Sequence, residues 1–150
     1  MSTTAEEKLA LKLQRTFAAP RERVFAAWTD PEQVKHWFGP DGCTVSSIRS
    51  DLRVGGEYRF AVVSEQYGAM AVRGEFREIA PPSRLVYTWQ WEDDPDYANR
   101  ETLITVEFIE HGGSTEIRLT HENFPSAENA KNHEYGWTGA LEKLAALLNT

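Results

Sequence analysis

The strongest constraint in this sequence is a series of short alternating segments that follow one another about every ten residues. From residue 43 onward, turn-forming residues separate six such segments, and apolar and polar side chains alternate within them. A period of two is typical of a strand with one buried face. Several connections are short, so we expect neighbouring strands to pair as antiparallel hairpins. The predicted strands cover residues 43–52, 57–65, 69–79, 84–91, 101–110 and 114–121.

Helices are predicted on both sides of this series. A further strand near residues 9–17 precedes two short helices, of which one begins after Pro20 and the other is capped by Asp30. At the end of the chain, one long helix is predicted from Ser126 to about residue 148. Its apolar face has helical spacing and consists of Trp137, Leu141, Leu144 and Leu148. The order predicts an α+β fold in which seven antiparallel strands and one long helix bury their apolar faces against each other.

Composition excludes several classes of protein. The 150 residues carry 16 Lys and Arg against 23 Asp and Glu, a net charge of −7, which argues against nucleic acid or an anionic membrane as a partner. No apolar stretch is long enough to cross a membrane, and the polar start predicts no signal peptide. Cys43 is the single cysteine, so we expect a cytoplasmic protein without an internal disulfide.

Five segments together resemble a known superfamily. They are Arg15–Pro20, Val24–Pro31, Trp37–Pro40, Asp51–Phe60 and Gly136–Trp137. These segments resemble the SRPBCC superfamily and, more narrowly, the small bacterial form of the family named for the activator of heat shock protein 90 ATPase. The resemblance extends from about residue 9 to residue 148 and therefore covers nearly the whole chain.

The resemblance implies a helix-grip fold, shared with START lipid-transfer domains, birch-allergen-like proteins and aromatic polyketide cyclases. In this fold a curved seven-stranded antiparallel sheet wraps around the long C-terminal helix, and two short helices lie between strands one and two. A hydrophobic cavity separates the sheet from the long helix. We therefore expect one domain over residues 1–150, in which about residues 1–8 form a flexible N-terminal segment.

The aromatic residues supply most of the candidate cavity lining. Such side chains can simply fill the core, or they can line a pocket and offer their N–H and O–H groups to a ligand. The candidates are the residues expected on inward faces, namely Trp37, Tyr58, Phe60, Met70, Tyr87, Trp89, Trp91, Phe108, His121, Tyr135, Trp137 and Leu141.

Two polar residues fall on faces that the alternation predicts to be inward. Arg15 follows a run of leucines, and His121 follows Ile117 and Leu119. Each can reach solvent from a strand end, or it can orient a polar group of a ligand inside the cavity. The acidic run of residues 92–96 is interpreted as a solvated loop, with a lip over the cavity mouth as the alternative.

Motifs for catalysis and metal binding are missing from the sequence. It contains no HExxH motif, no partner for Cys43, no GxSxG nucleophile elbow and no phosphate-binding loop of the GxxxxGK[ST] type. We therefore expect neither a metal site nor a cofactor. Any acid–base pair would have to be assembled from Arg15, Tyr87, His121 and Tyr135.

Three functions remain open from the sequence. The first is a binding protein that holds a small apolar or aromatic molecule in the cavity. The second is an enzyme similar to polyketide cyclases and hydrolases, which acts on an aromatic substrate and needs an acid–base pair in the cavity. The third is a cofactor of the chaperone ATPase, as the family name suggests. We rank it last because only about eight residues precede the first strand, where the eukaryotic activators carry a separate chaperone-binding domain. The ligand and the oligomeric state are left open.

Trp137 is predicted to be the most important single side chain of the core. The helical spacing places it on the buried face of the last helix. We expect Trp137→Ala to lower the free energy of unfolding by roughly 3–5 kcal/mol, because it removes a large buried side chain and opens a cavity. Chemical denaturation of the two proteins measures this difference. An unchanged midpoint would show that the predicted helix phase is wrong.

Overall fold

The computed structural model describes residues 9–39, 42–66 and 68–149. Residues 1–8, predicted to be a flexible segment, lie outside the described part. The elements follow the predicted order, with one short 3-10 helix in addition. Their bounds are β1 (Leu11–Phe17), α2 (Arg21–Thr29), α3 (Pro31–Val34), β2 (Cys43–Ser50), β3 (Glu57–Ser64), β4 (Gly68–Ala80), β5 (Arg84–Trp91), η1 (Pro95–Tyr97), β6 (Thr102–His111), β7 (Ser114–Glu122) and α4 (Ala127–Leu148).

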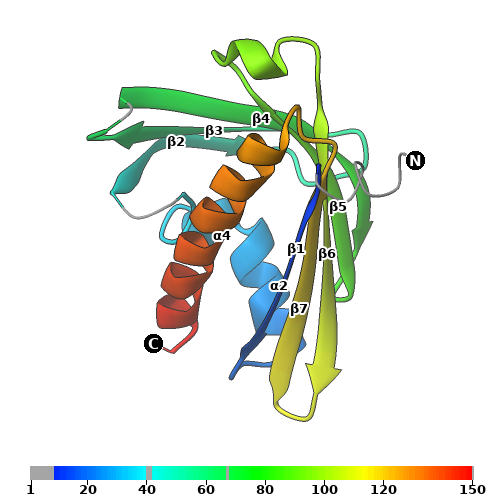
Figure 1. The fold of residues 1–150 in the computed structure, drawn as a ribbon. Helices are drawn as coiled ribbons and strands as arrows, with labels where there is room; N and C mark the ends of the chain where they lie inside the picture. Colours follow the sequence, from blue (N-terminus) through cyan, green and yellow to red (C-terminus); the bar gives the residue numbers. More distant parts are fainter. Residues whose placement is uncertain (1–8, 40–41, 67, 150) are drawn as a thin grey trace.

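The seven strands form one antiparallel sheet in the order β1-β7-β6-β5-β4-β3-β2. The predicted hairpins between consecutive strands are confirmed from β2 to β7. The first strand joins the other end of the series, where β1 pairs with β7 over its whole length. The sheet wraps around α4, and α2 lies in the same hollow next to β6 and β7 (Figure 1). This arrangement is the α+β helix-grip fold that was predicted.

Two irregularities help the sheet to curve. The pairing register shifts between Val45 and Ser47 on β2, and again between Phe76 and Glu78 on β4. An extra residue on one strand bends that strand and increases its twist. Both shifts lie in the β2–β4 half of the sheet, which folds over the upper part of α4 in Figure 1.

Helix α4 supplies the central layer of the core. Its N-terminus is capped by Ser126, whose hydroxyl accepts a hydrogen bond from the backbone N–H of Asn129. The predicted helix phase is confirmed, because all four residues of the expected apolar face are buried: Trp137, Leu141, Leu144 and Leu148. The helix continues through Gly136 and Gly139 without interruption.

Gly74 on β4 allows a side chain of one strand to reach across to another. The Tyr58 ring lies over Gly74, and its hydroxyl donates a hydrogen bond to the carbonyl of Thr88 on β5. A Cβ at position 74 would lie 2.0 Å from the Thr88 carbonyl oxygen and 2.6 Å from the Tyr58 ring. Only glycine therefore permits this contact, which connects β3 to β5 across β4.

We expect Gly74→Ala to lower the free energy of unfolding by about 3 kcal/mol, because both clashing groups are held in place by the sheet. Gly113→Ala is the matched control, since a Cβ at that position meets no atom within 4 Å. The control should change stability by less than about 0.5 kcal/mol. Urea denaturation of the two variants makes the comparison, and equal losses would contradict the proposed role of Gly74.

Candidate functional site

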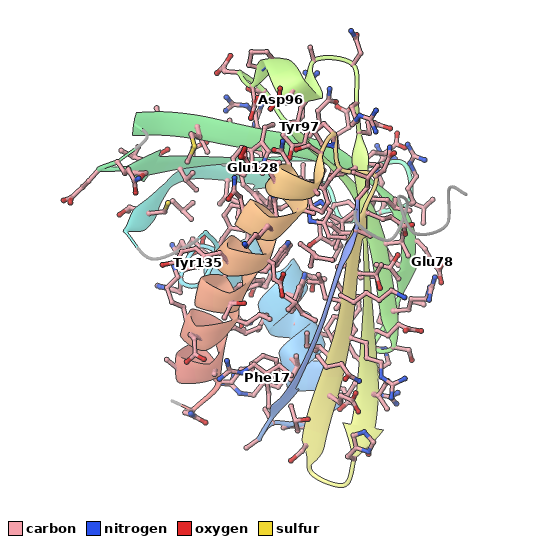
Figure 2. The ribbon with its side chains drawn as sticks, viewed as in Figure 1. Phe17, Glu78, Asp96, Tyr97, Glu128 and Tyr135 are labelled. Atoms are coloured by element: carbon pink, nitrogen blue, oxygen red, sulfur yellow. The ribbon has the colours of Figure 1, made fainter. Side chains whose placement is uncertain are left out.

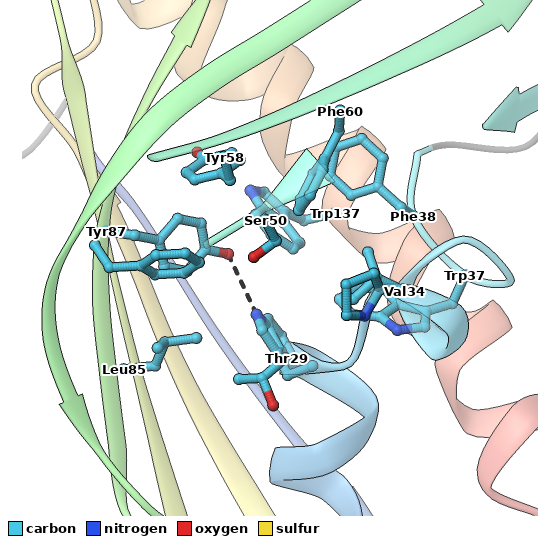
Figure 3. Close-up of a pocket in the computed structure, with 13 residues that line it drawn as sticks. Thr29, Val34, Trp37, Phe38, Ser50, Tyr58, Phe60, Leu85, Tyr87 and Trp137 are labelled. Atoms are coloured by element: carbon cyan, nitrogen blue, oxygen red, sulfur yellow. Dashed lines mark hydrogen bonds between the residues drawn. The ribbon is translucent and has the colours of Figure 1, made fainter. Parts of the chain in front are cut away.

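A small, partly open cavity lies between the sheet, the two short helices and α4. Its volume is about 20 Å³, measured as the space open to the centre of a water-sized sphere. Such a space holds roughly one water molecule. The lining side chains come from β2, β3, β4, β5, α2, α4 and the segment of α3 with the residues that follow it, and Figure 3 shows how they converge. They are Trp28, Thr29, Pro31, Val34, Trp37, Phe38, Ser50, Tyr58, Phe60, Phe76, Leu85, Tyr87 and Trp137.

Two buried tyrosine hydroxyls are among the polar groups at this cavity. The Tyr87 hydroxyl accepts a hydrogen bond of 3.2 Å from the indole N–H of Trp28, drawn as the dashed line in Figure 3. Its own hydrogen finds no acceptor among the described residues, whereas the Tyr58 hydroxyl donates to Thr88. Burial raises the pKa of Tyr58 and of Tyr87. Both side chains are therefore neutral hydrogen-bonding groups near pH 7.

A chain of buried hydrogen bonds runs beside the cavity from α4 to β5. Thr102 donates its hydroxyl hydrogen to the carbonyl of Trp89 at 2.6 Å, so its oxygen must accept the hydrogen of His121 Nε2 at 2.8 Å. His121 Nδ1 then carries a lone pair, which accepts the indole N–H of Trp137 at 3.1 Å. His121 is fully buried, and burial lowers its pKa well below the ordinary value near 6.5.

His133 forms a second buried link between α4 and the sheet. The indole N–H of Trp91 donates to His133 Nε2 at 2.9 Å, and Nδ1 donates to the backbone carbonyl of Asn129 at 2.9 Å. Burial also lowers the pKa of this imidazole. Sequence reasoning missed His133, although it lies four residues before Trp137 and therefore on the same face of the helix.

The indole N–H of Trp89 is buried without a partner. Trp89 is 4% exposed, and its Nε1 has no hydrogen-bond partner among the described residues. An unpaired buried donor costs about 1–3 kcal/mol. Two side chains that line the cavity touch this ring, namely Phe38 and Trp137, each with a centroid separation of 5.6 Å. Trp89 therefore lies one layer of rings behind the cavity.

The structure brings five of the predicted lining residues around the cavity: Trp37, Tyr58, Phe60, Tyr87 and Trp137. Trp89, Trp91 and His121 belong to the hydrogen-bonded layer behind it. Phe108 and Leu141 are buried core residues away from the cavity, and Met70 packs at the edge of the core. Trp28 and Phe38 also line the cavity, although neither was among the predicted lining residues.

Two predicted residues lie away from the interior. Tyr135 is 81% exposed and projects from the outer side of α4 (Figure 2), so the prediction that it lines the cavity is wrong. It lies two residues from Trp137, which places it on the opposite side of the helix. Arg15 pairs with Glu142 of α4 at 2.6 Å, and the two side chains are 31% and 66% exposed. It reaches the rim of the fold, as the solvent-facing alternative predicted.

The acidic segment of residues 92–96 is only partly the solvated loop that was predicted. It continues into η1, whose Tyr97 is fully buried and donates its hydroxyl hydrogen to Asn129 at 2.9 Å. Glu92 forms a bidentate ion pair with Arg59. These contacts attach the segment to the first turn of α4 at one end and to the outer sheet face at the other.

Comparison with protein families identifies the chain. The family model described as activator of Hsp90 ATPase homolog 1-like protein matches residues 18–149. The chain belongs to this family. Comparison of the sequence with curated proteins gives no match.

Solved structures of similar proteins share the fold of this family member. The AHSA1 protein from Silicibacter pomeroyi is 32% identical with a TM-score of 0.82, and the alignment covers 93% of this chain and 97% of that one. A protein from Chromobacterium violaceum is 27% identical with a TM-score of 0.84, over 95% and 98% of the two chains. CalU16 from Micromonospora echinospora is 24% identical with a TM-score of 0.70, over 93% and 75%, and supports the fold alone.

Two kinds of feature are missing from the described residues. No helix in the described part of the chain is long and apolar enough to span a lipid bilayer. Within the same residues, no group of three or more His, Cys, Asp or Glu side chains is arranged to hold a metal ion.

The two buried histidines predict how stability depends on pH. The folded state keeps His121 neutral below pH 6.5, whereas the unfolded chain takes up a proton there. The free energy of unfolding should therefore fall as the pH drops below about 6.5, and His121→Gln should make this slope shallower. His36→Gln, at the surface, is the control that retains both buried imidazoles. Urea denaturation between pH 5 and 8 gives the slopes, and equal slopes in all three proteins would contradict the prediction.

Proposed function

We propose that this protein binds a small aromatic or apolar molecule that carries a hydrogen-bond acceptor. The observation that carries the proposal is the unpaired indole N–H of Trp89, buried within a layer of aromatic rings. Buried polar groups nearly always have partners, so an orphaned donor one layer of rings behind a cavity suggests an acceptor supplied from outside the chain. The Tyr87 hydroxyl, whose hydrogen has no acceptor among the described residues, offers a second donor nearby.

The ligand enters by displacing a ring, because a cavity of about 20 Å³ cannot hold an organic molecule. Phe38 is the ring we assign to this movement. It follows the four-residue helix α3 and lies between Trp89 and Phe60, with centroid separations of 5.6 and 4.9 Å. In this proposal, rotation of Phe38 opens the cavity toward the Trp89 indole, and aromatic walls then enclose the ligand.

Binding is favoured over catalysis by the chemistry of the lining. Among the described lining residues, the titratable groups with shifted pKa values are Tyr58 and Tyr87, and both shifts keep the hydroxyl protonated. An acid–base reaction needs a group that exchanges its proton near the working pH. The four candidates for an acid–base pair do not converge, since Arg15 and Tyr135 lie at the rim and on the surface. The hypothesis that the protein is a cofactor of the chaperone ATPase rests on the family name alone. The contacts around the cavity give it no support.

A matched pair of probes tests the role of the Trp89 N–H. 1-Tetralone and tetralin share one bicyclic skeleton, and only the ketone offers an acceptor. We expect the ketone to bind about tenfold more tightly than the hydrocarbon, which corresponds to one additional hydrogen bond. Trp89→Phe retains an aromatic ring without the N–H and should abolish this preference. NMR titration of both proteins with both probes measures the four affinities.

Stability provides the control for this experiment. Denaturation of Trp89→Phe should show a folded protein, because the replacement retains most of the buried apolar area. Equal affinity of the parent protein for the two probes would contradict the assigned acceptor site. Failure of both probes to bind at millimolar concentration would contradict the binding function itself.

A further inference from the structure

The outer face of the sheet carries a row of three arginines that the interior site does not use. Arg49 on β2 lies directly opposite Arg59 on β3, and Arg59 lies directly opposite Arg73 on β4. Adjacent strands are about 4.8 Å apart, so the three side chains leave the sheet within roughly 10 Å of one another. All three alternate with inward residues such as Tyr58 and therefore project away from the cavity.

Like charges in directly opposed positions destabilise a sheet. The chain as a whole has a net charge of −7, so it has more acidic than basic side chains. Acidic side chains are therefore numerous enough to neutralise the row. Only one carboxylate does so directly. Glu92 receives two hydrogen bonds from Arg59, at 2.7 and 3.0 Å. The side chains of Arg49 and Arg73 form no hydrogen bond or ion pair with any described residue.

The row lies in an open groove with a volume of about 890 Å³. The basic residues that line this groove are all arginines, the side chain best suited to bidentate binding of carboxylate and phosphate. The two outside the row have partners of their own. Arg53 pairs with Asp51 at 2.7 Å, and Arg77 pairs with Glu75 at 2.8 Å. Arg77 also pairs with Glu101 at 3.4 Å, and Glu57 lies directly opposite Glu75. The carboxylates other than Glu92 therefore belong to the other part of the groove, and the positive charge is concentrated at the row.

Glu92 indicates what the row can hold. Its carboxylate lies against Arg59 with the fork geometry typical of a bound anion. The hydrogen bonds from Arg59 lower the pKa of Glu92, and the charges of Arg73 and Arg49 lower it further. Three guanidinium groups thus act on one carboxylate, and together the four side chains carry a net charge of +2.

We propose that Arg49, Arg59 and Arg73 form a binding site for a small anion with two linked phosphoryl groups, in which the Glu92 carboxylate occupies part of the site when the ligand is absent. A phosphoryl group carries up to two negative charges and three acceptor oxygens on one phosphorus atom. Two linked phosphoryl groups therefore provide anionic acceptors for both Arg49 and Arg73. This site lies on the face opposite the cavity and is independent of the function proposed above.

Replacement of arginines and of Glu92 should change affinity in opposite directions. The probe is inorganic pyrophosphate, with binding measured by isothermal titration calorimetry at low salt. We expect Arg49→Gln and Arg73→Gln each to weaken binding about tenfold, because each removes a charged donor. Glu92→Gln should tighten binding about threefold or more, because it removes the competing carboxylate. Neither arginine variant should lower the denaturation midpoint, since each relieves repulsion in the row.

Arg84→Gln is the matched control. Arg84 lies on β5 six residues before Gln90, the partner of Arg73, and it pairs with Glu78 and Glu107. Its separation from the row exceeds the distance over which exposed charges interact at physiological salt. Equal weakening by Arg84→Gln and Arg49→Gln would show a diffuse charge effect and overturn the proposal. Weaker binding by Glu92→Gln would also overturn it.

A second anion tests the chemical class. Citrate carries three carboxylates of similar span but no phosphoryl group. Tighter binding of pyrophosphate than of citrate supports the phosphoryl assignment, and the reverse order overturns it. Absence of binding by both anions at millimolar concentration would overturn the anion site as a whole.

Discussion

The structure depends on one buried hydrogen-bonded chain that attaches α4 to the sheet. Trp137 donates to His121, His121 donates to Thr102, and Thr102 donates to the carbonyl of Trp89. Each hydrogen bond runs in the same direction, so each donor is polarised by the one before it. The chain connects the helix to β7, β6 and β5 in turn. It also fixes which imidazole nitrogen carries the hydrogen, and it requires a neutral His121.

This attachment explains why the interior contains so many rings and so little space. Once Trp137 is held against the sheet, its ring lies 5.6 Å from Trp89 and 6.0 Å from Trp28. Aromatic rings in tilted and edge-on contact fill volume efficiently and leave gaps about the size of a water molecule. The cavity of about 20 Å³ is such a gap. Binding of an organic ligand therefore requires one ring to move. The unpaired N–H of Trp89 is the donor for which the ligand would supply an acceptor.

Much of the fold could be predicted from the sequence, because period-two alternation and helical spacing fix which side chains share a face. The buried face of α4 and the hairpins between consecutive strands from β2 to β7 followed from that, whereas the pairing of β1 with β7 did not. The error at Tyr135 came from treating proximity to Trp137 in sequence as proximity in space, although two helical residues point in nearly opposite directions. The short helix η1 and the burial of Tyr97 had no periodic signal, because both depend on a hydrogen bond to Asn129 of a distant element.

The arginine row was beyond sequence reasoning for a different reason. Arg49, Arg59 and Arg73 are adjacent only because the registers of β2, β3 and β4 place them opposite one another, and a slip of one residue would turn an arginine to the other face.

The two proposed sites have one physical property in common. In most of the fold, local preferences and tertiary contacts agree: side chains cap α3 and α4, apolar faces are buried, and most exposed arginines have acidic partners. Apart from the unpaired, buried Arg21 Nε, two disagreements stand out, namely an unpaired indole inside and a row of like charges outside. Each lowers stability, so each needs a compensating use if selection is to retain it. A ligand acceptor would satisfy the first and a phosphorylated anion the second. Because the disagreements lie on opposite faces of one sheet, a single ligand cannot satisfy both.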